Sequence, residues 1–264
     1  MNQPLRVVVL GHGVIGSVVA AELAAGAVPG AALGAVVSRS PVADPPAPQL
    51  DLTAALGDAD LVVECAGQPV VHQVIDQVVG SGVDLLVTSV GACLDPRLAG
   101  RLAALGPGRV HATHGAVGGL DLLASARRAA PFERVLMRTT KRPATLVRDW
   151  MPADQVRAIT GAQRTVQVFA GTPVEAVRLF PDSLNIVAGV ALAIGGPQQL
   201  TVELCADPDA ISSTHRIEAV GPLGEYTFEM RHRPSARNPR SSAITPYSVL
   251  HTVAALTASP PPVL

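Results

Sequence analysis

The chain has 264 residues, of which 20 are Lys or Arg, 21 are Asp or Glu and 48% are hydrophobic. That length and apolar content can fill one large domain or two moderate ones, with a substantial core. The charges nearly cancel and no basic block stands out. This argues against nucleic acid or an anionic membrane as a partner and favours a small-molecule ligand.

Several features predict a cytoplasmic protein. The apolar stretches are interrupted by Gly, Asp or Pro well short of the about 20 residues that cross a bilayer. Residues 1–4 lead directly into a strand, without the layout of a signal peptide. Cys65, Cys93 and Cys205 form no close pair, so we expect buried thiols rather than disulfides. The histidines have no second ligand at short spacing, and we predict no metal site.

The first segment carries a nucleotide-binding motif. Residues 5–10 form a predicted strand that ends in Gly11, Gly13 and Gly16 at the spacing G-x-G-x-x-G, and residues 17–25 follow as a helix. In a dinucleotide-binding turn the first glycine permits the tight turn, the second lets a pyrophosphate approach the backbone, and the third lets helix and strand pack closely. The phosphates then lie against the free N–H groups of the helix. The expected cofactor contacts here are Gly11, Gly13, Val14, Ile15 and Gly16.

A second predicted strand, residues 32–37, ends in Ser38, Arg39 and Ser40. NAD-preferring folds usually place an Asp or Glu at this strand end to bind the ribose 2′-OH. Hydroxyls and a guanidinium suit a 2′-phosphate instead, so we expect NADP(H) to be used at least as well as NAD(H). The alternative is a solvated loop, with the ribose held in another way.

Strands alternate with helices through the rest of the N-terminal half, after a proline-rich loop at residues 41–48. Strands are predicted at residues 60–67, 83–89 and 109–113, and helices at residues 51–56, 70–79 and 95–105. This alternation is typical of βαβ units and predicts an α/β Rossmann domain with a doubly wound parallel sheet. Ligands bind at the carboxyl ends of such strands, so Ala66 and Gly67 are further candidate cofactor contacts.

The pattern changes after residue 114. Strands are predicted at residues 134–140, 165–169 and 200–205, a hairpin at residues 215–231, and helices at residues 121–130, 174–179, 185–194 and 238–256. Strands in runs, with helices on one side, predict a second α+β domain with a mixed sheet. We divide the chain into a Rossmann domain (1–114), a substrate and dimerisation domain (115–237), a C-terminal helix that packs back on the Rossmann domain (238–258) and a tail (259–264).

Further stretches carry a more specific pattern. They are residues 62–66 (VVECA), 115–121 (GAVGGLD), 140–143 (TKRP), 180–181 (FP) with Asn185, 206–208 (ADP), 215–218 (HRIE) and 238–242 (NPRSS). In order and spacing they resemble the L-aspartate dehydrogenase family over nearly the whole chain. The resemblance implies a reversible reaction in which oxaloacetate, ammonia and a reduced nicotinamide cofactor give L-aspartate through iminosuccinate. It carries the active-site role over to His215 and cofactor contacts over to Ala116 and Asn185, and it implies a homodimer or a larger homo-oligomer.

The chemistry of this reaction selects further residues. Histidine, with an unperturbed pKa of about 6.5, suits a proton shuttle near neutral pH, so we assign His215 as general acid and base. The alternative is a strand histidine satisfied by the backbone. A dicarboxylate needs cations and hydrogen-bond donors. The candidates for binding it are His114, Lys141, Arg142, Asn238, Ser241 and Ser242.

Interpretations of these candidates without a role in substrate binding stay open. Lys141 and Arg142 can form a solvated face, and Asn238 can be a helix cap. We interpret His232 as a structural or surface residue. The active site is expected between the two domains.

The chain departs from the family pattern at His114, at Arg142 and just before Asn185. These departures leave open a related dehydrogenase or imine reductase that acts on another oxo acid or imine. An alternative of a different class is an NAD(P)-binding sensor that has lost turnover.

Overall fold

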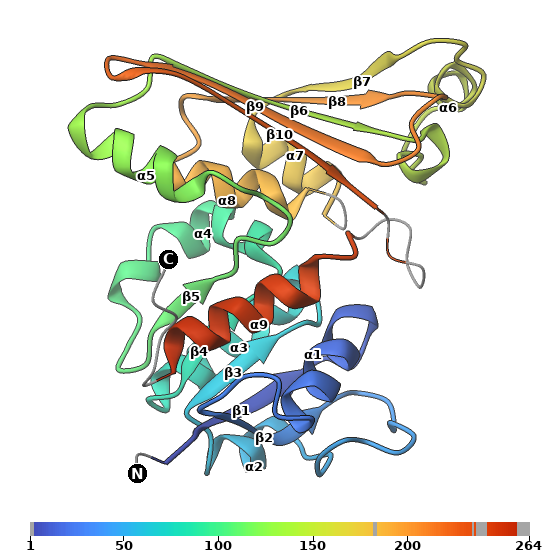
Figure 1. The fold of residues 1–264 in the computed structure, drawn as a ribbon. Coiled ribbons are helices and arrows are strands. Elements are labelled where there is room, and N and C mark those ends of the chain that lie inside the picture. Colours follow the sequence, from blue (N-terminus) through green and yellow to red (C-terminus); the bar gives the residue numbers. More distant parts are fainter. Residues whose placement is uncertain (1–2, 182–183, 234, 236–241, 258–264) are drawn as a thin grey trace. The chain divides into compact units, whose positions relative to one another are not determined.

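The computed structural model describes residues 3–181, 184–233, 235 and 242–257. The chain divides into two compact units. The first unit contains the chain up to Gly115 and again from Ile244, and the second runs from Ala116 to Ala243. Each unit contains one sheet with its own helices (Figure 1).

The first unit is a parallel α/β sheet. Its strands lie in the order β2-β1-β3-β4-β5, and every neighbouring pair is parallel. The strands are β1 (Leu5–Leu10), β2 (Ala31–Val37), β3 (Leu61–Glu64), β4 (Asp84–Val87) and β5 (Val110–Ala112). The helices are α1 (Val14–Ala24), α2 (Leu52–Leu56), α3 (Gln68–Gly80), α4 (Pro96–Ala99) and α9 (Thr245–Leu256).

Helices cover both faces of this sheet. Val8 and Val62 pack with α3 residues such as Val74 in one apolar cluster. Val7, Val9 and Val63 belong to a second cluster, which includes Val19 and Leu23 of α1 and Val249 and Val253 of α9. Alternate residues of a strand point to opposite faces, so an uninterrupted run of valines is buried on both sides. The predicted Rossmann architecture is confirmed.

Two predicted helices were wrong in extent. The closing helix was expected from Asn238, but α9 begins at Thr245, with Pro246 in its first turn. Proline suits a first turn because the N–H groups there have no partner within the helix. The helix expected at residues 95–105 ends as α4 at Ala99, where Gly100 follows, and only a short 3₁₀ turn comes after it.

The second unit is a mixed sheet in the order β10-β9-β6-β8-β7. β6 and β8 are parallel, and the other neighbouring pairs are antiparallel. The strands are β6 (Arg134–Lys141), β7 (Val166–Gly171), β8 (Leu200–Ala206), β9 (Ser213–Gly221) and β10 (Gly224–His232). The helices are α5 (Leu120–Ala129), α6 (Ala153–Thr160), α7 (Pro173–Leu179) and α8 (Asn185–Ala193). This is the predicted α+β unit, except that α6 lies between residues 140 and 165, where no element was predicted.

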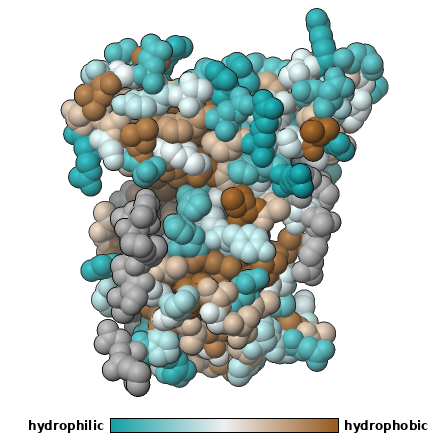
Figure 2. All heavy atoms as spheres, in the orientation of Figure 1, coloured by the Kyte–Doolittle hydropathy of each residue, from teal (hydrophilic) through white to brown (hydrophobic). Residues whose placement is uncertain are grey.

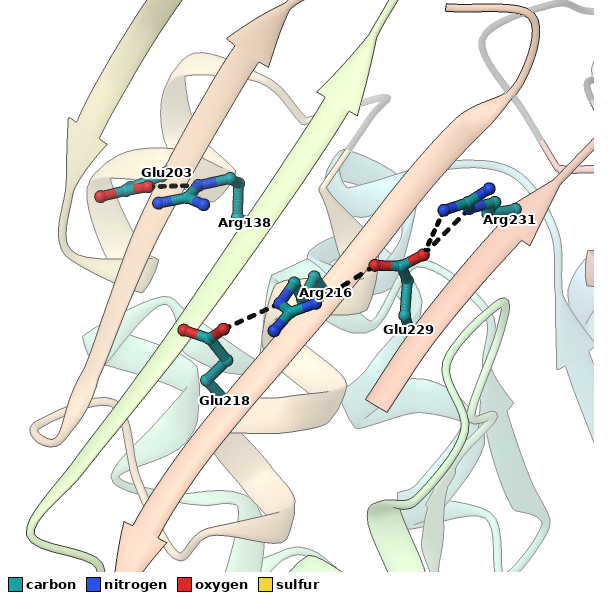
Figure 3. A network of polar contacts seen from close by, with 6 residues as sticks. All are labelled: Arg138, Glu203, Arg216, Glu218, Glu229 and Arg231. Atoms are coloured by element: carbon teal, nitrogen blue, oxygen red, sulfur yellow. Dashed lines mark hydrogen bonds and ion pairs between the residues drawn. The ribbon is translucent and has the colours of Figure 1, made fainter. Parts of the chain in front are cut away.

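The two faces of the second sheet differ in chemistry. Helices α5, α7 and α8 lie on one side of it, here called the inner face (Figure 1). Met137, Val202 and Ile217 are fully buried. The residues next to them along the strands form a ladder of ion pairs on the outer face (Figure 3). The pairs are Arg138 with Glu203, Arg216 with Glu218 and Glu229, and Arg231 with Glu229. Exposed pairs of this kind stabilise a fold only slightly, but they identify the polar face.

The surface combines hydrophilic and apolar residues (Figure 2). Exposed large apolar side chains include Trp150, Ile211 and Leu223, and isolated examples of this kind are ordinary in globular proteins. Among the helices of the described residues, none is both long enough and apolar enough to cross a membrane.

Candidate functional site

The glycine turn after β1 has room for a ligand at one of its three glycines. Gly11 has φ +97, and a Cβ there would lie 2.7 Å from the Cys65 carbonyl oxygen. A Cβ on Gly16 would overlap the Gly11 carbonyl. By contrast, a Cβ on the exposed Gly13 would meet no atom within 4 Å. Gly11 and Gly16 therefore serve the fold, whereas Gly13 leaves open space at the start of α1. This arrangement fits a pyrophosphate at the helix N-terminus.

A buried carboxylate fixes the neighbouring loops. Glu64, at the end of β3, is 0% exposed. Its Oε1 accepts hydrogen bonds from the N–H groups of Ala66 and Gly67, both at 2.7 Å. The Ser89 hydroxyl donates to Oε1 at 2.9 Å, and the Ser89 N–H donates to Oε2 at 3.0 Å. These donors compensate the cost of burying the charge, and they hold together the loops that follow β3 and β4.

The charge of the same carboxylate raises the pKa of two nearby cysteines. Burial, and then the charge of Glu64, raise the pKa of Cys65 to about 12. The same two causes raise the pKa of Cys93 to about 11. Both side chains are therefore thiols at neutral pH, as inert buried cysteines are.

The loop after β2 lies next to the glycine turn. The Gly11 N–H donates to the Val37 carbonyl at 2.8 Å. The Gln49 side-chain amide then donates to the carbonyls of Ser38 and Ser40, at 3.1 and 2.9 Å. The Arg39 side chain is exposed. The structure thus holds the backbone of the three predicted 2′-phosphate contacts beside the turn.

The inner face of the second sheet becomes polar at one end. Thr139 and Lys141 of β6, His215 of β9 and His232 of β10 meet there, and we call these four residues the polar cluster. Thr139 pairs with His215 across β6 and β9, and their Oγ1 and Nδ1 atoms are 3.0 Å apart. The rings of His215 and His232 are 5.8 Å apart. Lys141 and His215 are only 5% and 3% exposed.

Burial and neighbouring positive charges set the protonation of His215 and Lys141. Burial, then the charge of Lys141, then that of His232 lower the pKa of His215 to about 3. Burial and the charge of Arg148 lower the pKa of Lys141 to about 8. His215 is thus almost entirely neutral at pH 7, where a histidine with the ordinary pKa of about 6.5 is still partly protonated. An anion bound beside these groups stabilises their protonated forms and raises both pKa values.

Sequence reasoning missed two residues, namely His232 in the polar cluster and Arg148, whose charge acts on Lys141. Arg148 lies between the predicted strands at residues 134–140 and 165–169, where no element was predicted. Its Nη1 donates to the carbonyls of Thr145 and Val147, and its guanidinium lies 5.4 Å from the centre of the Phe180 ring. His232 was interpreted as a structural or surface residue. The alternation of the hairpin strand was the available signal, because it puts His232 on the same face as Phe228 and Met230.

The other predicted site residues lie in several places. Arg142 is exposed, and its Nε donates to the Ala210 carbonyl at 2.6 Å, so it does not share the polar cluster with Lys141. The Ala116 carbonyl accepts a hydrogen bond from His232 Nε2 at 2.7 Å. Asn185 is the first residue of α8.

His114 belongs to the first unit. Its ring lies edge-on to that of His251, with a centroid separation of 5.8 Å. Ser242 precedes α9, and Asn238 and Ser241 lie outside the described residues. Among the described residues, no group of three or more His, Cys, Asp or Glu could hold a metal ion.

Two family models match the chain. The model described as "Aspartate dehydrogenase, C-terminal" matches residues 121–256. The model described as "Homoserine dehydrogenase, NAD binding domain" matches residues 11–111. The two matches therefore fall mainly on the second and the first unit, respectively.

Curated proteins and a solved structure agree with the first of these models. The chain is 37% identical to L-aspartate dehydrogenase of Cupriavidus necator over 199 residues, which cover 74% of this chain and 73% of that protein. It is 34% identical to L-aspartate dehydrogenase 2 of Bordetella pertussis over 260 residues, which cover 94% and 95%. The crystal structure of aspartate dehydrogenase from Thermotoga maritima matches with a TM-score of 0.73 and 26% identity, covering 94% of this chain and 95% of that one.

Proposed function

The chain belongs to the aspartate dehydrogenase family, and we propose that it catalyses the reversible reductive amination of oxaloacetate with ammonia to L-aspartate. The observation that carries this proposal is the buried polar cluster, in which Lys141, His215 and His232 meet at one end of a sheet. Buried cationic groups whose pKa values are lowered by burial and by neighbouring positive charges favour an anionic ligand, and oxaloacetate is a dianion.

A nicotinamide dinucleotide, when bound, supplies the hydride for reduction of the imine and accepts it in the reverse direction. The glycine turn and the first N–H groups of α1 would hold its pyrophosphate. Ser38, Arg39 and Ser40 would bind a 2′-phosphate, so NADP(H) is proposed to serve at least as well as NAD(H). Ala116 and Asn185 are proposed to orient the nicotinamide end.

Lys141 is proposed to bind a substrate carboxylate. The side chain is buried, and its pKa of about 8 leaves it mostly protonated at neutral pH. A buried ammonium interacts with a carboxylate more strongly than an exposed one, because solvent screens the pair less. Substrate binding at this end of the sheet therefore depends on the protonated form of Lys141.

His215 is proposed to move the protons. Its Nδ1 is engaged with Thr139, so we assign proton exchange with the substrate to Nε2. In the direction of amination, Nε2 donates a proton as the carbinolamine oxygen leaves as water. The substrate carboxylates raise the pKa of His215 above its value in the unliganded protein, which makes the imidazolium accessible in the complex. In the reverse direction, the neutral ring accepts the proton.

The decisive experiment follows absorbance at 340 nm with purified protein, oxaloacetate and ammonium, in parallel with NADPH and NADH. Rapid oxidation that depends on ammonium is the expected result, and comparison of the two cofactors gives the preference. Oxidation without ammonium would indicate plain reduction of an oxo acid and would contradict the proposal. Cofactor binding without turnover would point to another imine substrate or to a sensor.

We also propose that the protein forms a homodimer or a larger homo-oligomer, as the family resemblance implies. Light scattering coupled to size-exclusion chromatography measures the mass directly. A mass equal to the 27.1 kDa of one chain would contradict this proposal.

A further inference from the structure

The start of the second unit is held by the last strand of its hairpin. His232 is the final residue of β10, and its Nε2 lies 2.7 Å from the carbonyl oxygen of Ala116. A carbonyl can only accept, so His232 Nε2 carries the proton and donates it to this bond. Ala116 is 6% exposed. Removing the donor to a buried carbonyl lowers the stability of the folded protein when no water can replace that donor.

A second contact anchors the same segment to the same strand. Gly119 has φ +77, and a Cβ there would overlap the ring of Phe228. The ring therefore lies directly against the Gly119 backbone. Phe228 and His232 are four residues apart on β10, so both side chains point to the same face of the sheet. Residues 116–119 are thus held at both ends by one face of one strand.

The polar cluster adjoins this anchor. The ring of His232 lies 5.8 Å from that of His215, and Met230, two residues before His232, pairs with His215 across β9 and β10. One imidazole therefore contacts both the ring proposed to move protons and the segment that contains Ala116.

We propose that His232 is a positioning residue of the dehydrogenase site, whose Nε2–H holds the Ala116 carbonyl and so fixes residues 116–119 at the strand end that carries His215. The structural half of this proposal stands on the contacts above. Its catalytic half rests on the proposed function, in which Ala116 contacts the cofactor. A loosened segment then weakens binding of the cofactor more than binding of oxaloacetate.

The experiment compares His232→Gln with His232→Leu. Glutamine can place an amide N–H close to the position of the imidazole Nε2–H, whereas leucine fills a similar volume without a donor. His72→Leu is the matched control, because His72 lies on α3 of the first unit with its side chain 39% exposed. Phe228→Leu removes the aromatic ring that packs against Gly119 in the same segment. This variant still tests how the segment is held if His232→Leu does not fold.

The first readout is hydrogen exchange of the peptide that covers residues 115–123. We expect faster exchange in this peptide for His232→Leu and for Phe228→Leu, and exchange close to that of the parent protein for His232→Gln and the control. Unchanged exchange in His232→Leu would overturn the proposal. Exchange that rises equally throughout β9 and β10 would also overturn it, because His232 would then only stabilise the hairpin.

The second readout separates the cofactor from the substrate. For His232→Leu we expect the KM for NADPH to rise about tenfold, as for loss of one buried hydrogen bond, with a smaller change in the KM for oxaloacetate and recovery in His232→Gln. An unchanged KM for NADPH would overturn the catalytic half. If the parent protein lacks ammonium-dependent turnover, the proposed function fails by itself, while hydrogen exchange still decides whether His232 holds the segment.

Discussion

The carboxyl edge of the first sheet and the polar cluster of the second sheet are built in opposite ways. At the first, backbone groups dominate: the open space at Gly13, the N–H groups of α1, and loops tied by their own amides to Glu64. At the second, side chains from three strands converge. A backbone-built site needs local chain geometry, whereas a side-chain-built site needs the correct register of distant strands.

The two regions also differ in how their buried charges are compensated. The Glu64 carboxylate receives hydrogen bonds from Ala66, Gly67 and Ser89 and is satisfied within the fold. In the second region, burial lowers the pKa of both Lys141 and His215, the charge of Lys141 lowers that of His215 further, and the charge of Arg148 lowers that of Lys141. The buried charge of the first region is therefore compensated without a ligand, whereas an anionic ligand stabilises the second region. Substitutions in the two regions should then have different consequences.

The largest effect is expected from His215→Ala. Loss of the general acid and base should lower turnover by about 10²- to 10⁴-fold, while cofactor affinity stays close to that of the parent protein. Steady-state kinetics and a fluorescence titration with NADPH measure the two quantities. His72→Ala serves as the control. Most of the turnover surviving in His215→Ala would refute the catalytic assignment.

The glycine turn offers a matched pair of substitutions. In Gly16→Ala the new Cβ overlaps the Gly11 carbonyl, so we expect a loss of stability of roughly 3 kcal/mol or more. In Gly13→Ala the Cβ meets open space, so the fold should keep its stability while cofactor affinity falls. Denaturant unfolding and NADPH titration test both. A Gly13→Ala protein that binds cofactor normally would contradict the assignment of the turn.

Lys141 and Arg142 allow a test of the polar cluster. Lys141→Met should raise the KM for oxaloacetate by about tenfold or more, whereas Arg142→Met should change it little, because Arg142 is exposed and bonded to Ala210. A larger effect at Arg142 would reverse our assignment.

The protonation of Lys141 also predicts a pH dependence. Its pKa is about 8 in the unliganded protein, and only the protonated form attracts a carboxylate. Affinity for a non-reacting dicarboxylate such as succinate should therefore fall as the pH rises above about 8, and Lys141→Arg should shift this limb to higher pH. Calorimetric titration with succinate across the pH range measures this affinity. If the fall in affinity occurs at the same pH in Lys141→Arg, it reports the deprotonation of another group.

The smallest effect is expected at the loop after β2. Arg39→Ala should raise the KM for NADPH by about tenfold and leave that for NADH nearly unchanged, because only NADPH carries the 2′-phosphate. Arg97→Ala, another exposed arginine of the first unit, is the control. An unchanged ratio of the two KM values would show that Arg39 does not contact the phosphate.

The sequence by itself predicted the parts that depend on local pattern. The strand and glycines of residues 5–16, the alternating elements up to β5, and the hairpin of β9 and β10 follow from hydrophobic period and turn residues. Helix boundaries were less predictable. For α9 the available signal was Pro246, because proline favours the first turn of a helix, and α6 carries few apolar residues to mark it.

Only the tertiary structure decided what meets His215. Thr139 lies far along the chain from the hairpin that contains His215 and His232, and the pairing of β6 with β9 brings their side chains to one face. The tertiary structure also buried Lys141 while leaving its neighbour Arg142 exposed and bonded to Ala210, and it brought His232 within hydrogen-bond distance of the Ala116 carbonyl. Burial then moved the pKa of His215 far from its ordinary value. Register and desolvation arise from contacts between distant segments, so no local pattern in the sequence could specify them.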